Sequence, residues 1–233
     1  MREKSRAGRK GQFTTEYLII VSIALLIIGF FLIYVFVYYS SYYNASVASK
    51  VSTTATSLVK EANYVTNEGL GSKISFSLTV PQLTLLGSFF CGNFVKVSSG
   101  TYSYIQNAKL NIVGILPMTP GNYIMYAMYN NSDRVQIGFE ADITYINYSY
   151  SISGNTLNYN IEFFGSKHTP TALTAYNISV FTYGGQYINS TRSVTNADGV
   201  ASSSIHLNQV PATLLVYIFA LGTNVVAPSC LQT

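Results

Sequence analysis

The chain has 233 residues, of which only 9% are charged and 48% are hydrophobic, so an intrinsically disordered or highly charged protein is excluded. The formal net charge of +4 comes entirely from residues 1–11, which carry five basic side chains and one acidic side chain. The remaining residues are neutral overall. We therefore expect no nucleic-acid-binding surface on the body of the protein.

A long apolar run follows the basic segment. Within residues 18–37 only Ser22 and Tyr34 carry a polar side-chain group, and no residue is charged. About 20 such residues cross the hydrocarbon layer of a membrane as a helix. A cleaved secretory signal has a shorter apolar core that ends in small residues, whereas this run ends in YYSSYYN. Because the basic residues precede the run, we expect the N-terminus in the cytoplasm and the rest of the chain outside.

A short motif joins the basic segment to the apolar run. Residues 10–17 read KGQFTTEY, with Lys10 and Gly11 directly before Gln12. This segment resembles the class III signal peptide of archaeal type IV pilin-like proteins, although Thr14 stands where the family often has serine. The resemblance implies that a prepilin-type peptidase removes residues 1–11 as a cytoplasmic leader, cutting after Gly11, and leaves Gln12 at the mature N-terminus.

Glu16 and Tyr17 are the last two residues before the apolar run. A carboxylate beside lipid costs free energy unless it has a partner, and the α-amino group freed at Gln12 is a suitable one. In the family that the motif resembles, the glutamate at the fifth mature position pairs with the N-terminal amine of a neighbouring subunit. The resemblance therefore implies an assembly role for Glu16, the alternative being an ordinary residue at the headgroup level.

Helical periodicity continues beyond the apolar run. Apolar residues recur at helical spacing at Val47, Val51, Ala55, Leu58, Ala62 and Val65. Two glycines, Gly69 and Gly71, predict the end of the helix near residue 68. The sequence thus predicts one helix over residues 12–68, whose outer half covers its apolar stripe with either the following domain or neighbouring subunits.

Residues 72–233 are predicted to form a β-rich head, which makes the fold class α+β. Alternating patterns indicate a first β-rich unit, residues 72–139, with strands near 74–80, 93–97, 102–113, 123–129 and 134–139. A second unit, residues 140–233, is predicted to form an Ig-like β-sandwich with strands near 141–151, 156–163, 174–183, 186–194, 200–207 and 213–221. The segment TNADGVASSSIHL resembles a hairpin of bacterial Ig-like surface domains.

The two cysteines, Cys91 and Cys230, both follow the predicted span. They form no CxxC motif, so neither a zinc site nor a thioredoxin-like site is expected. On the oxidising side of a membrane a pair of cysteines is usually bridged, and we predict a disulfide between them. The alternative is a buried free thiol at Cys91, which follows two phenylalanines.

Other candidate sites are weak. Glycosylation sequons occur in a number close to that expected from composition, at Asn44, Asn130, Asn147, Asn177 and Asn189. Two carboxylates, Glu140 and Asp142, are too few to predict a calcium site, and His168 and His206 have no evident catalytic neighbours. We expect neither an enzyme nor a metal or cofactor site.

Taken together, the sequence predicts a structural subunit, either a pilin or an adhesin, of an archaeal type IV pilus-like surface filament. Its expected partners are a prepilin-type peptidase, identical or related subunits, and the membrane before assembly. The alternative is a single-pass membrane-anchored surface protein that never polymerises and binds a ligand through an Ig-like ectodomain. A simple anchor would have no use for the Gly11-Gln12 junction or for Glu16.

Overall fold

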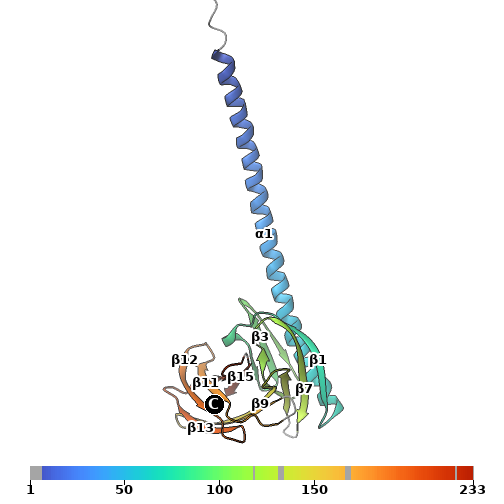
Figure 1. Ribbon diagram of the computed structural model, residues 1–233, viewed down its shortest axis with the longest axis vertical. Coiled ribbons are helices and arrows are strands. Elements are labelled where there is room, and N and C mark those ends of the chain that lie inside the picture. Colours follow the sequence, from blue (N-terminus) through green and yellow to red (C-terminus); the bar gives the residue numbers. More distant parts are fainter. Residues whose placement is uncertain (1–6, 118, 131–133, 166–168, 224, 233) are drawn as a thin grey trace, which may run out of the picture. The chain divides into compact units, whose positions relative to one another are not determined.

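The computed structural model describes residues 7–117, 119–130, 134–165, 169–223 and 225–232, with side chains from residue 15 onward except that of Asn130. The chain divides into two compact units, Met1–Ser46 and Val47–Thr233. The first unit contributes the N-terminal part of one long helix, and the second contains the rest of that helix and all of the described strands (Figure 1).

Helix α1 extends over Ala7–Glu68, so it begins inside the predicted leader and ends at the predicted residue. Two glycines stop it, because Gly69 and Gly71 both have positive φ angles of the kind that a side chain disfavours. The hydroxyl of Ser72 then satisfies the end of the helix by donating to the Val65 carbonyl at 2.6 Å. The glycine signal in the sequence therefore fixed this boundary correctly.

Within the second unit, the outer half of α1 packs against the head. The apolar stripe is 0–3% exposed at Val51, Ala55, Leu58, Val59, Ala62 and Val65. These side chains belong to the same hydrophobic cluster as residues of the sheets. The Thr54 hydroxyl donates to the Thr79 carbonyl at 3.2 Å, and the Lys109 backbone N–H donates to Asn63 Oδ1 at 2.8 Å. The head thus covers the stripe, so neighbouring subunits are not needed for that purpose.

The described strands form three sheets in a sandwich-like domain. The first has the order β1-β7-β8-β5. In that order its strands are Lys73–Val80, Gly121–Asn130, Arg134–Phe139 and Asn111–Gly114. The second has the order β13-β10-β9, from Val200–His206, Thr156–Phe164 and Tyr145–Ser153. The largest has the order β12-β11-β14-β15-β2-β3-β4, with β6 also on β15. In that order, with β6 last, its strands are Tyr187–Val194, Ala175–Thr182, Thr213–Ala220, Val225–Gln232, Phe89–Cys91, Phe94–Ser99, Tyr102–Asn107 and Leu116–Pro117. A 3-10 turn, η1, covers Leu85–Gly87.

The expected boundary at residues 139 and 140 does not separate two units. The largest sheet contains strands from both sides of it, because β15 pairs in parallel with β2 at Ser229 and Phe90. The same strand pairs with β6 through Val225 and Pro117. Residues 72–139 and 140–233 also share one hydrophobic cluster. The prediction of two units failed because the pairing that joins them links residues far apart in the sequence, and local patterns carry no signal for it.

Candidate functional site

The most unusual feature of the first unit is its exposed apolar surface. From Tyr17 to Tyr43 the large apolar and aromatic side chains of α1 are 44–74% exposed, except for Val21, which is half-buried. The most apolar window of the helix has a mean hydropathy of 3.1 and no buried residue. Contiguous apolar surface on this scale marks a membrane or protein interaction site. Length and composition fit a membrane span, although a signal sequence near the N-terminus has the same properties.

The Ser22 hydroxyl inside this apolar segment needs no outside partner, and most tyrosines of the segment lie at its outer end. The Ser22 hydroxyl donates to the Leu18 carbonyl at 2.7 Å, so the helix itself satisfies it. Tyrosines gather at the end of the segment, at Tyr38, Tyr39, Tyr42 and Tyr43, and all of them are exposed. Tyrosine is enriched where a span meets the membrane–water interface. The segment therefore has an apolar body and an aromatic end, which suits lipid.

The predicted processing residues lie in the first two turns of α1. Lys10, Gly11 and Gln12 are helical, and their side chains fall outside the described part of the chain. Glu16 and Tyr17 are exposed. Among the residues whose side chains are described, the ion pair that forms joins Lys60 and Glu61 at 3.5 Å. The Glu16 carboxylate thus has no cationic partner in that part of the chain.

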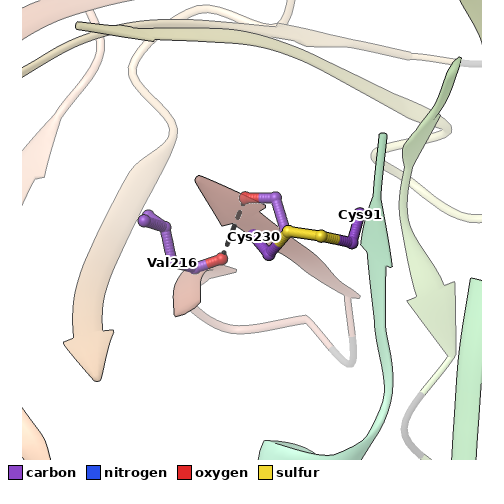
Figure 2. The surroundings of a disulfide bond; sticks show 4 residues. Cys91, Val216 and Cys230 are labelled. Carbon is purple, nitrogen blue, oxygen red and sulfur yellow. Dashed lines mark hydrogen bonds between the residues drawn. A yellow bond between two sulfur atoms is a disulfide. The ribbon is translucent and has the colours of Figure 1, made fainter. Parts of the chain in front are cut away.

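A disulfide joins Cys91 of β2 to Cys230 of β15 (Figure 2), with 4.9 Å between the Cα atoms and 139 positions between the residues. The bond lies where the two strands run in parallel and where the backbone register contains one residue pair, Ser229 and Phe90. The neighbouring Ser229 hydroxyl donates to the Val216 carbonyl of β14 at 3.1 Å. The disulfide therefore reinforces the short junction that joins the C-terminal strand to the first part of the head.

The sequons differ in accessibility. Asn44 on α1 and Asn147 on β9 are exposed. Asn177 and Asn189 are half-buried, and their amide nitrogens are engaged, donating to the Ser179 hydroxyl at 3.0 Å and to the His206 carbonyl at 2.7 Å. The side chain of Asn130 lies outside the described residues. The folded head thus presents Asn147 far better than Asn177.

We expect a transferase acting on the folded head to modify Asn147 and to leave Asn177 unmodified. The reason is accessibility: the Asn147 side chain is exposed and its amide donates to the Glu162 carboxylate at 3.2 Å on the surface, whereas Asn177 is half-buried in the β11 ladder. Glycopeptide mass mapping of protein from native cells checks this, with Asn147→Gln expected to lose the glycan and Asn177→Gln to leave the pattern unchanged. A glycan found on Asn177 and none on Asn147 would contradict the expectation.

The acidic and histidine candidates do not converge. Glu140 and Asp142 lie in a bend before β9, which begins at Tyr145 and not near residue 141 as expected. His206 is exposed at the end of β13, and His168 lies outside the described residues. In the described part of the chain, no three His, Cys, Asp or Glu side chains are grouped so that they could hold a metal ion.

Comparisons with known proteins add little. No protein-family model matches the sequence, and no curated protein matches it. Among solved structures, a β-glucuronidase from Parabacteroides merdae matches at 12% identity with a TM-score of 0.30 over 60% of this chain, which spans 19% of that enzyme. A DUF3823 family protein from Bacteroides ovatus matches at 12% identity with a TM-score of 0.35, over 68% of this chain and 96% of that one. These similarities are too low to support an argument about function.

Proposed function

We propose that this chain is a structural subunit, either a pilin or an adhesin, of an archaeal type IV pilus-like filament on the cell surface. The observation that carries the proposal is the helix segment from Tyr17 to Tyr43, in which every large apolar side chain except that of Val21 is exposed. Such a helix is as stable among identical helices as it is in lipid, so transfer from membrane to filament core costs little free energy. The β-rich head faces outward and supplies adhesion or subunit contacts.

In this proposal a prepilin-type peptidase cuts between Gly11 and Gln12 while the precursor is held in the membrane. The new amine at Gln12 then pairs with Glu16 of a neighbouring subunit and guides it into the filament. Both residues precede the exposed apolar segment, which is where the carboxylate would otherwise enter an apolar environment without a partner. The non-polymerising anchored protein remains the second candidate, since the same segment would serve it as a span.

We further propose that Tyr145–Gln232 is Ig-like. Counting from β9, the first, second and fifth strands form one sheet, and the third, fourth, sixth and seventh form part of another. The Ig constant-type sandwich has the same arrangement except that its fourth strand pairs with the fifth. Here the fourth strand, β12, pairs with β11, yet Asn189 of β12 still donates to the His206 carbonyl of β13. The strand order supports the assignment.

The processing step gives the decisive test. Mass spectrometry of protein isolated from native cells is expected to show a chain that starts at Gln12. Replacing Gly11 with valine should block the cut, because a pocket that closes over glycine has no space for a side chain, whereas Gly8→Val changes the leader away from the junction and should leave it intact. Surface-exposed protein that retains Met1 or Arg2 would favour the non-polymerising anchor.

A further inference from the structure

The second unit contains an open cavity of about 390 Å³ where β2, β5, β8, β9 and β15 meet. This volume lies in the range of small-molecule sites. Polar residues from several strands line it, among them Asn111, Arg134, Tyr148, Ser149, Tyr150 and Ser229. The cavity lies beside the disulfide, since Cys230 also lines it. A rigid junction of several strands thus surrounds a polar hollow.

Arg134 gives the cavity a positive charge. It is the first residue of β8 and is half-buried. Among the described residues its guanidinium makes one long hydrogen bond, in which Nη1 donates to the Tyr148 carbonyl at 3.4 Å. No carboxylate of the described side chains lies within ion-pair distance of it. A guanidinium has five N–H donors and binds a carboxylate through two of them, so most of its capacity is available for an acidic group.

The wall beside Arg134 is aromatic and uncharged. The rings of Tyr148 and Tyr150 stack with 5.3 Å between centroids and an interplanar angle of 28°. Burial raises the pKa of Tyr148 to about 12 and raises that of Tyr150 well above 10, so both hydroxyls stay neutral at physiological pH. The Ser229 and Tyr150 hydroxyls lie within hydrogen-bond distance of each other, at 3.3 Å. No negative charge on this wall competes for the guanidinium.

The rim carries neutral hydrogen-bonding groups. Asn111 and Ser149 are both exposed there, and an amide and a hydroxyl can each donate and accept. We propose that the cavity binds an acidic sugar, with its carboxylate on Arg134 and its ring hydroxyls on Asn111 and Ser149. One cation, several neutral polar groups and an aromatic wall match a polyhydroxylated ligand with a single negative charge better than they match a neutral sugar. The site deepens the proposed adhesion role and rests on the head facing outward.

The test is titration calorimetry of the full chain in detergent micelles with D-galacturonate, D-galactose and acetate. Galacturonate is expected to bind at least tenfold more tightly than either of the others, since galactose lacks the carboxylate and acetate lacks the ring hydroxyls. Arg134→Gln should weaken galacturonate binding at least tenfold, about 1.4 kcal/mol. Arg192→Gln removes an exposed arginine of β12, outside the cavity, and should change nothing. Ser149→Ala should weaken galacturonate binding and leave acetate unaffected.

Three results would overturn the proposal. The first is the absence of galacturonate binding at millimolar concentrations, the second is equal affinity for galacturonate and acetate, and the third is an Arg134→Gln variant that binds as the wild type does. The melting temperatures of the variants and of the wild type should be equal, which shows that a variant that no longer binds is still folded. Because the assay uses unassembled protein, its failure is distinguishable from a failure of filament formation.

Discussion

Replacing Glu16 with alanine is expected to give a cleaved, membrane-inserted protein that no longer enters filaments. The carboxylate stands directly before an apolar segment that is exposed along its length, and no described cation pairs with it within the chain. In a filament core the new amine at Gln12 of a neighbouring subunit would be left without its partner. Removing one member of a buried charge pair costs about 3–5 kcal/mol, which corresponds to a loss of assembly of more than about a hundredfold.

Electron microscopy of cells that express the variant measures the effect as filaments per cell. Glu16→Gln should fail in the same way, because it keeps the shape of the side chain and removes the charge. Glu68→Ala is the matched control, since Glu68 is also an exposed glutamate of α1 but lies at its other end. Normal filaments from Glu16→Ala would make this residue an ordinary flank of the span.

The sequence predicted best those elements that local patterns define. Two glycines ended α1 at the expected residue, and alternation located β1 and β8 to within one residue. The predicted strand at 102–113 is wrong, because the structure has β4 and β5 there in different sheets. Between these strands Lys109 contacts the end of α1, where its backbone N–H donates to Asn63 and its Nζ donates to Asn67 at 2.7 Å. That contact diverts the chain, and alternation alone does not reveal it.

The last strand, β15, was not predicted from the sequence. It contains Pro228, and proline lacks the N–H donor that a strand in the interior of a sheet uses. In the structure Pro228 faces Tyr217 of β14. On the other side β6 pairs with residues 225 and 226, and β2 pairs with Ser229. Pro228 therefore lies between two short partners, where its missing donor is tolerated. The cavity was also missed, because it is built from five strands that only the folded chain brings together.

Removing the disulfide is expected to weaken the head in both equilibrium and mechanical unfolding. A bridge that closes 139 positions restricts the unfolded chain strongly, and the entropy estimate for such a loop is about 5 kcal/mol, from which strain subtracts. The Cys91→Ser, Cys230→Ser double variant is expected to lose about 2–5 kcal/mol in the free energy of unfolding. Urea denaturation of the full chain in micelles measures this, and a reducing agent should destabilise the wild type while leaving the double variant unchanged.

Under a pulling force the disulfide prevents the residues inside its closed loop from extending. A filament subunit held by α1 carries load through its head, and with the bond intact only the segments outside the closed loop can extend. Reduction releases 139 positions, or roughly 480 Å of fully extended chain at about 3.5 Å per residue. Pulling on handles at Ser46 and at the C-terminus should therefore show a long extension after reduction and a short one before it. Equal extensions would mean that the cysteines are not bridged in the native protein, and the junction of β2 and β15 would then depend on its one backbone pair and the surrounding core.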